Sequence, residues 1–351
     1  MRAPRALVAT LLALLFGLAL ALELHFVDVG QGDGVLIRLP DGRAVVYDAG
    51  PSRGGMLDYL RRVGVEQVVL VVASHAHADH IGGLPAVIDA YAPGFVLDNG
   101  VTHTTATFER YLDAVERSGA LLLEPIRRTI TLGDVQLHVL PSPVQPTWGH
   151  NDNSVGLIVE YGDFRASLTG DAEERLFTWW LEEVPDLLDR VEVHKASHHG
   201  SDHGDTDEAL ARLRPAVVVV SAGRDNAYGH PHAAALARYD AVGATVHRTD
   251  LEGTIVVHVA ADGGVRVVAE REAPAPLPGV AVAPGASADA CVDINTAPET
   301  ALHRIIHIDE SRAADVVDAR PFGAVEELTR IAGIGPARLR DILEQGLACA
   351  P

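Results

Sequence analysis

Four potential metal ligands fall within six residues in the first quarter of the chain. The apolar run over residues 68–74 is followed by His75, His77, Asp79 and His80. Imidazole nitrogens with a carboxylate suit zinc, and also manganese or iron, whereas calcium and magnesium prefer oxygen ligands. A strand ending directly before the cluster would place these side chains in a loop, where they can serve two ions. The spacing predicts a two-metal site that activates water for hydrolysis.

This cluster resembles the H-x-H-x-D-H signature of the metallo-β-lactamase superfamily, and the resemblance covers roughly residues 22–272. The resemblance implies further metal ligands at the positions that match the family's other motifs. Asp171 resembles the family's aspartate that bridges two ions. Either His198 or His199 should complete the site. His150 matches a third histidine ligand of many members only in part, so it is either a ligand or a neighbour.

Four separated segments resemble the hydrolase domain of ComEC-type DNA-uptake competence proteins. They are FVDVGQGDG at 26–34, the run from 150 to 173, KASHHGS at 195–201 and GHPH at 229–232. The resemblance implies that Gln31, Asp33 and Asn153 line the cleft, although the first two can also be simple turn residues. Stabilisation of phosphate charge would come from His230 or Lys195, and His230 could instead protonate a leaving group.

Asp79 is expected to share a hydrogen bond with the attacking water besides binding metal. Proteins of the ComEC type also carry a polytopic membrane channel, which this sequence does not contain. The chain therefore resembles the hydrolase domain detached from that channel.

The C-terminal segment, residues 289–351, resembles competence-type helix-hairpin-helix domains through NTA at 295–297 and IAGIGPAR at 331–338. In this motif a glycine turn lets backbone N–H groups at a helix start face a DNA phosphate. The resemblance implies DNA contacts from the second hairpin, through Gly333, Gly335, Arg338 and Arg340. Gly335 is expected to need a positive φ. In the first hairpin IHIDE at 306–310 replaces the glycine turn. The alternative for the whole domain is a structural or protein-interaction role.

The net charge of −20 argues against a protein that coats polyanions through a broad basic surface. Any contact with DNA must therefore be local, as the helix-hairpin-helix motif allows. Lys195 is the only lysine of the chain, which makes its place inside a motif notable.

The elements that must position these residues alternate between short strands and helices. Pattern alone does not separate a doubly wound sheet from a two-sheet sandwich. The resemblance implies an α/β fold of the αββα sandwich type, followed by a small all-α domain. Strands are predicted over residues 23–28, 35–39, 44–48, 68–74, 135–140, 155–161, 165–169, 191–196, 217–221, 253–259 and 265–268, and helices over 54–63, 84–90, 106–118, 172–183, 207–212 and 232–242.

Residues 1–21 carry two arginines, an apolar run and an Ala-Leu-Ala end, which is typical of a secretory signal peptide. An uncleaved membrane anchor is the alternative, although the apolar run is shorter than the ~20 residues that a spanning helix needs. A proline-rich and alanine-rich linker is expected over 273–288. Cys291 and Cys349 are the only cysteines, and an exported location would permit a disulfide between them, with two unrelated thiols as the alternative.

These features predict an exported hydrolase with two zinc or manganese ions that cleaves phosphodiester bonds of DNA. The expected locations are the periplasm, the cell surface or the medium, and DNA-uptake machinery is a possible partner. A lactonase or β-lactamase would share the metal site but would not need the C-terminal module. A DNA-tethering protein with a decayed site is a third alternative.

Overall fold

The computed structural model describes residues 22–271, 291–302, 304–308, 310–331, 334–345 and 347–350. The signal peptide and the linker predicted from the sequence lie outside these residues. Within them, no helix combines the length and the apolar character needed to cross a bilayer. The hydrolase domain and the C-terminal domain are described separately below.

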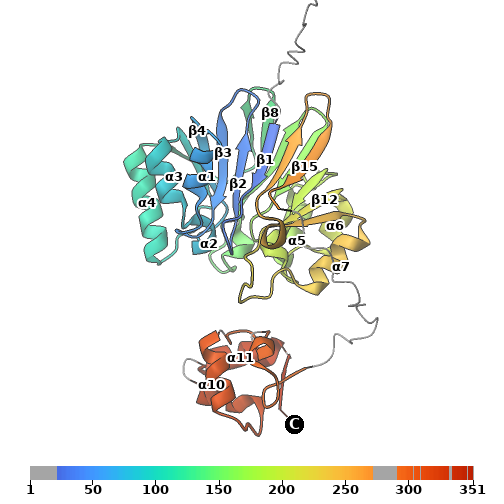
Figure 1. Cartoon of the computed structure of the whole chain (residues 1–351). Helices are drawn as coiled ribbons and strands as arrows, with labels where there is room; N and C mark the ends of the chain where they lie inside the picture. The colour runs from blue at the N-terminus through green and yellow to red at the C-terminus, as the bar shows by residue number, and fades with distance from the viewer. Residues whose placement is uncertain are drawn as a thin grey trace, which may run out of the picture.

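Two sheets packed face to face form the hydrolase domain (Figure 1). The first has eight strands in the order β15-β14-β1-β2-β3-β4-β5-β6, and the second has seven in the order β13-β12-β11-β10-β9-β8-β7. The first sheet consists of β1 (Leu22–Phe26), β2 (Gly34–Arg38), β3 (Ala44–Ala49), β4 (Val68–Ala73), β5 (Phe95–Asp98), β6 (Leu121–Leu123), β14 (Ile255–Val259) and β15 (Val265–Ala269). The second consists of β7 (Thr129–Leu132), β8 (Val135–Leu140), β9 (Gly156–Tyr161), β10 (Phe164–Leu168), β11 (Val193–Lys195), β12 (Val217–Val220) and β13 (Thr245–Arg248).

Continuous apolar runs form the central strands because both of their faces are buried. In β3, Val45 and Tyr47 point between the two sheets, where they pack with Leu137 and Leu157 of the second sheet. The alternate residue Val46 belongs to the layer between the first sheet and its helices. Successive side chains of a strand point to opposite faces, so one run supplies both apolar layers.

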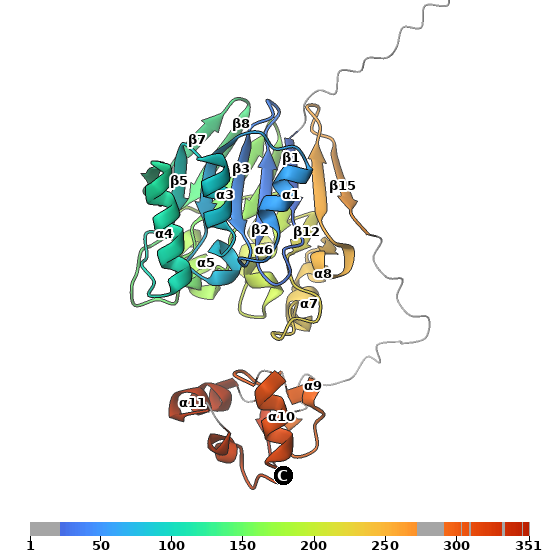
Figure 2. The same ribbon diagram turned by 60° about the vertical axis from the view of Figure 1, so that its left-hand side comes forward.

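Helices cover the outer face of each sheet, which confirms the predicted αββα sandwich. The first sheet is covered by α1 (Met56–Arg62), α3 (Leu84–Tyr91) and α4 (Ala106–Ser118), with α1 and α3 in front of the strands in Figure 2. The second is covered by α5 (Glu174–Glu183), α6 (Asp207–Leu213) and α7 (Ala233–Ala241). The short elements α2 (Ala78–Ile81), η1 (Asn151–Asn153), η2 (Ser197–Gly200) and α8 (Thr249–Glu252) lie in the connections.

Four strands of the sandwich were not predicted from the sequence: β5, β6, β7 and β13. Three of them, β6, β7 and β13, are edge strands of their sheets. An edge strand is short and is covered on fewer sides, so its residues carry a weak burial pattern. In β6, for example, Leu121 and Leu122 are exposed although both are leucines.

The C-terminal domain packs four short helical elements around an apolar core. These are α9 (Glu299–Leu302), α10 (Glu310–Asp318), η3 (Val325–Arg330) and α11 (Pro336–Gln345). Two side-chain amides connect segments of this domain that are distant in sequence. Asn295 exchanges two hydrogen bonds with the backbone of Phe322, at 2.8 and 2.7 Å. Gln345 forms hydrogen bonds with the backbone of Arg304 and Ile306, both at 2.9 Å. The predicted all-α domain also contains a two-residue parallel pairing of β16 (Val292–Asp293) with β17 (Ala348–Cys349).

Both hairpin turns differ in detail from the sequence expectation. His307, in the first turn, has φ +67°, a left-handed conformation that glycine adopts more easily. Gly335 does not have a positive φ, so that prediction was wrong. A Cβ at Gly335 would meet no atom within 4 Å, which leaves open space beside the start of α11. Gly333 lies outside the described residues, as does the side chain of Arg340, and Arg338 is exposed.

Cys291 and Cys349 form a disulfide with a Cα–Cα distance of 5.7 Å, as predicted. The bond closes a loop with a sequence separation of 58, and loop-closure entropy predicts a stabilisation of about 4 kcal/mol. Replacing both cysteines with alanine should therefore lower the hydrogen-exchange protection of α10 and α11 amides by about 10³-fold. Strand β9, in the hydrolase domain, is the internal control. Unchanged protection in α10 and α11 would contradict this estimate.

Candidate metal centre and cleft

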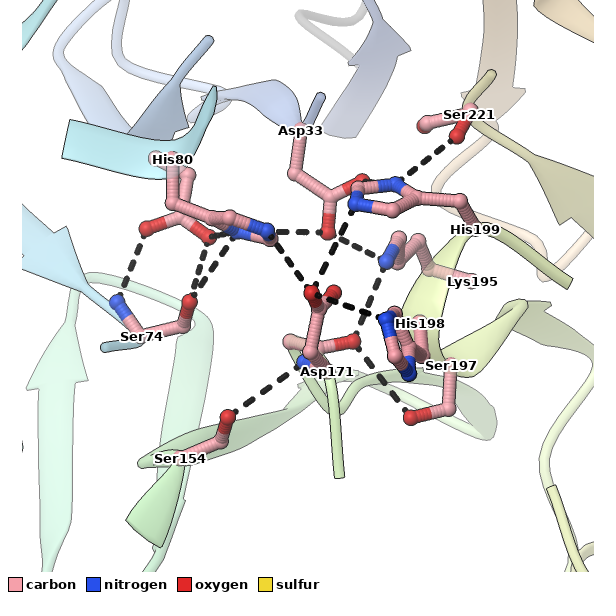
Figure 3. A network of polar contacts seen from close by, with 12 residues as sticks. Asp33, Ser74, His80, Ser154, Asp171, Lys195, Ser197, His198, His199 and Ser221 are labelled. Atoms are coloured by element: carbon pink, nitrogen blue, oxygen red, sulfur yellow. Dashed lines mark hydrogen bonds and ion pairs between the residues drawn. The ribbon is translucent and has the colours of Figure 1, made fainter. Parts of the chain in front are cut away.

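The predicted ligands come from loops that follow the ends of strands. β4 leads into His75, β10 leads into Asp171, and β11 leads into His198 and His199. The strands β10, β11 and β12 are parallel, so their carboxyl ends lie at one edge of the second sheet. The fold therefore brings these loops together, and Figure 3 shows the side chains of His80, Asp171 and His199 pointing toward one another.

Histidine nitrogens and one carboxylate meet at the centre of this cluster. The Nε2 of His75 lies 2.9 Å from the Nδ1 of His77 and 3.7 Å from the Oδ2 of Asp171. The same Asp171 oxygen lies 3.1 Å from the Nε2 of His80 and 3.5 Å from the Nε2 of His199. These three histidines lie around Asp171, as the bridging role would require.

The donor set fits divalent metal ions. The ligand atoms of His75, His80 and Asp171 lie within 4.8 Å of one another, and so do those of Asp79, His80 and His199. The Oδ1 of Asp171 and the Nε2 of His199 are buried without a hydrogen-bond partner. A buried polar atom without a partner is costly, and metal coordination would satisfy both atoms.

The sequence left His198 and His199 as alternative ligands, and in the structure both face Asp171. They have consecutive positive φ values, 47° and 56°, which are unusual for residues with a side chain. The Nδ1 of His199 lies 3.0 Å from the carbonyl oxygen of Ser221, which leaves Nε2 for the centre. The Nδ1 of His198 lies 3.0 Å from Glu173, and its Nε2 lies farther from Asp171, at 3.9 Å. This geometry favours His199 as the ligand.

Asp48 and Ser74 orient the centre, and the sequence analysis missed both. Asp48 accepts hydrogen bonds from the backbone N–H and the hydroxyl of Ser74, at 2.8 and 2.7 Å, and lies 2.9 Å from the Nδ1 of His80. A carboxylate on one ring nitrogen fixes which nitrogen is free to bind metal. The signal available in the sequence was the position of Asp48 at the end of the strand predicted over residues 44–48. In the structure Asp48 is fully buried and has φ +54°.

Asp33 and Lys195 lie beneath the centre instead of lining the cleft. Both side chains are fully buried, and they form an ion pair. The Lys195 ammonium also donates to the carbonyl oxygen of Gly170 (3.1 Å), and Asp33 lies 3.2 Å from the Nδ1 of His199. Because no part of Lys195 reaches solvent, its placement contradicts contact with a substrate phosphate. Lys195 instead neutralises the buried carboxylate of Asp33, and Asp33 in turn contacts the His199 ring.

The open side of the centre is a cleft of about 370 Å³. Gln31 lines it as predicted, and its Oε1 accepts a hydrogen bond from the backbone N–H of Gly223 (3.0 Å). The backbone at Gly32 passes so close to Asp79 that a Cβ would lie 2.1 Å from its carbonyl oxygen, so only glycine fits. The residues lining the cleft are Gln31, His77, Ala78, Asp79, Asn151, Asp171, His198, His199, Tyr228 and His230.

Asn153 and His150 lie apart from this lining. Asn153 is buried, and its amide bonds the backbone of Gln145 and Gly149, so it shapes the loop and does not line the cleft as predicted. The ring of His150 lies 5.5 Å from that of His77 and 4.3 Å from that of His103, a neighbour that the sequence analysis missed. His150 is therefore beside a ligand candidate, and it belongs to none of the four groups of possible ligands among the described residues.

Burial and the carboxylates set the charge state of the histidines. Burial lowers the pKa of His77 to about 4 and that of His230 to about 3. Burial also opposes charge on His80 and His199, but Asp171 and the other carboxylates beside the two rings together outweigh it and raise the pKa of both well above the usual value. A neutral imidazole is the form that binds metal, so metal binding would displace protons from these two rings.

Comparisons with known proteins agree with the fold and with both domains. The chain is 28% identical over 255 residues to the ComE operon protein 3 of Bacillus subtilis, covering 66% of this chain and 32% of that protein. It is 29% identical over 252 residues to the recombination protein 2 of Haemophilus influenzae, covering 67% and 29%. The chain thus spans about a third of the length of these relatives.

Another relative matches a shorter stretch. A deoxyribonuclease of Thioalkalivibrio is 44% identical over 59 residues, which is 17% of this chain and 16% of that protein. Residues 287–345 match the helix-hairpin-helix motif. Residues 27–224, more than half of the chain, match the metallo-beta-lactamase superfamily. The chain carrying this centre therefore belongs to the metallo-β-lactamase superfamily and ends in a helix-hairpin-helix motif.

Proposed function

We propose that the protein is an exported two-metal phosphodiesterase that acts on DNA. The observation that carries the proposal is the presence, in one chain, of a buried histidine and aspartate centre open to a cleft and a helix-hairpin-helix motif. The similarity to the ComE operon protein 3 and to the recombination protein 2, and the short match to a deoxyribonuclease, support the same substrate class. DNA-uptake machinery is the proposed partner.

His75, His77, Asp79, His80, Asp171 and His199 would hold the two ions, zinc or manganese. When bound, the ions would polarise a phosphoryl oxygen and lower the pKa of a bound water toward neutrality. Asp48 keeps the His80 ring in place, and Ser221 does so for His199. Such fixed ligand orientations reduce the reorganisation that the reaction requires.

His230 and Gln31 are the polar side chains proposed to contact the substrate. Because its pKa is lowered to about 3, His230 is neutral at pH 7 and can donate a hydrogen bond to a phosphate oxygen. The same shift leaves almost none of the ring protonated at pH 7, so we assign it hydrogen bonding in place of protonation of the leaving group. Asp79, one third exposed, can accept a hydrogen bond from the attacking water.

The direct test is hydrolysis of single-stranded DNA, duplex DNA, RNA and a chromogenic β-lactam by the purified protein, with and without chelator. Metal-dependent cleavage of DNA is expected. Cleavage of the β-lactam alone would contradict the proposal and favour a small-molecule hydrolase. DNA capture without any turnover would indicate a tether whose hydrolytic centre has decayed.

The C-terminal domain is proposed to raise the local concentration of DNA. Truncation after Arg271 should raise KM for long DNA by about tenfold or more, because a tether adds affinity without changing chemistry. The value of kcat on a dinucleotide should hardly change, and steady-state kinetics on both substrates measures this. Gly335→Val should give a milder loss, because the added side chain occupies the open space beside α11.

The salt dependence provides an independent check of the tether. A domain that contacts one or two phosphates should show a shallow slope, since each neutralised duplex phosphate contributes roughly −0.9 to the slope of log K against log salt. Unchanged kinetics of the truncated protein on long DNA would favour a protein-interaction role for this domain.

Export is proposed from the first 21 residues and is compatible with the disulfide. Mass spectrometry of protein recovered from outside the cytoplasm should show a chain that begins near Leu22. A soluble chain in that fraction that still carries Met1 would contradict cleavage.

A further inference from the structure

Tyr228 is an exposed aromatic side chain at the mouth of the hydrolytic centre. It lines the same cleft as Asp171 and His199, yet 64% of its surface is exposed. Large apolar or aromatic side chains elsewhere in the described cleft are absent, since the lining is otherwise polar, acidic or imidazole apart from Ala78. An exposed aromatic ring beside a reactive centre can stack on a planar ligand such as a nucleobase.

The Tyr228 ring is held in place by its neighbours. Its inner face is stacked on the ring of His230, with centroids 5.6 Å apart and an interplanar angle of 21°. His230 in turn meets the ring of His232 edge on, at 4.8 Å. His232 bonds Asp202 through Nδ1 and the carbonyl oxygen of Tyr228 through Nε2, both at 3.0 Å.

Asn226 fixes the loop that carries Tyr228. Its Oδ1 accepts hydrogen bonds from the backbone N–H groups of Tyr228 and His230, at 3.2 and 3.0 Å. Its Nδ2 donates to the carbonyl oxygens of Gly223 and His230, at 2.9 and 2.7 Å. Gly223 is bonded to Gln31 of the cleft, so the aromatic ring and the polar lining form one fixed surface.

The side chains of this cleft provide no positive charge from lysine or arginine to attract a nucleic-acid phosphate. Its lining contains neither lysine nor arginine, and Asp79 and Asp171 add negative charge that the metal ions would offset. Base stacking, which contributes about 1–3 kcal/mol per base, can supply affinity for a single strand that basic residues do not supply here. Bases inside a duplex are already stacked and cannot reach a side chain at the rim.

We propose that Tyr228, backed by His230, is a stacking platform for a nucleobase of single-stranded nucleic acid, adjacent to the phosphodiester that enters the centre. This inference rests on the proposed phosphodiesterase function. It adds a preference for unpaired strands, and it explains how an acidic protein can hold a nucleic acid at its reactive cleft.

The test compares two single strands of about 12 units: oligothymidylate and a base-free phosphate chain of abasic tetrahydrofuran units. Both are labelled with fluorescein and bound to the full chain in chelator, with fluorescence anisotropy as the measurement. The wild type should bind oligothymidylate about 5- to 150-fold more tightly than the base-free chain, which is the fold-change for 1–3 kcal/mol. Tyr228→Ala should lose most of this preference, whereas Tyr228→Phe should keep it.

Phe95→Ala is the matched control, because Phe95 is an aromatic side chain that is 44% exposed and lies outside the cleft. Annealing the oligothymidylate to oligoadenylate should remove the part of the affinity that depends on Tyr228. Equal binding of the two strands by the wild type, or a preference that survives in Tyr228→Ala, overturns the platform. Because binding is measured in chelator, this result is separate from the phosphodiesterase proposal, which fails if the metal-loaded wild type cleaves neither DNA nor RNA.

Discussion

Asp171→Ala should abolish bound metal and lower kcat/KM by about 10³-fold or more, because metal ions contribute several kcal/mol to stabilising the transition state. Asp171 lies between His75, His80 and His199, and its second oxygen has no hydrogen-bond partner. Removing it would leave the three rings without the carboxylate that joins them. The measurement is metal content by mass spectrometry together with steady-state hydrolysis.

Asp163→Ala is the control for this variant, because Asp163 is an exposed carboxylate in the turn between β9 and β10. It should retain metal and activity. Circular dichroism should show the same fold for both variants, since the αββα core does not include Asp171. Full metal content and normal turnover in Asp171→Ala would remove the two-metal interpretation.

Lys195→Met should lower the free energy of unfolding by about 3–5 kcal/mol, the usual cost of leaving one partner of a buried ion pair alone. Burial by itself would raise the pKa of Asp33, but Lys195 and His199 hold it below its usual value. Without the ammonium, a fully buried carboxylate keeps only histidine contacts. Urea unfolding followed by tryptophan fluorescence measures the hydrolase domain, which contains all three tryptophans.

Arg266→Met is the matched control, because Arg266 is an exposed cation on β15, and its change should stay within about 0.5 kcal/mol. The double variant Lys195→Met with Asp33→Asn removes both charges. Its loss of unfolding free energy should be smaller than the sum of the losses in the two single variants. If Lys195→Met unfolds at the same urea concentration as Arg266→Met, the ion pair does not stabilise the fold.

The ligand positions could be predicted because they follow apolar runs that become buried strands. His75 follows the run that forms β4, and Asp171 follows β10, so the ligand candidates stand directly after strand ends in the sequence. The edge strands β6 and β7 could not be predicted in this way. Their residues are mostly exposed or half-buried, so no periodic pattern marks them.

The supporting residues were harder to predict, because their roles depend on the position of another loop. Asp48 is a strand-end residue by pattern, and only the fold brings it 2.9 Å from His80. Asp33 was expected in the cleft because of its glycine-rich turn, and Lys195 was expected near the substrate because of its place in the KASHHGS segment, but both are fully buried. Their pairing across more than a hundred and fifty residues of sequence leaves no local signal.

The burial of Lys195 has a practical consequence for chemical labelling. It is the only lysine in the chain, and none of its side chain is exposed in the fold. Acylating and cross-linking reagents that target amines should therefore leave the native protein unmodified at lysine, and immobilisation through such reagents should occur through the N-terminal amine. Acylation of this single amine would instead require opening of the hydrolase core, so its rate reports how often that core opens.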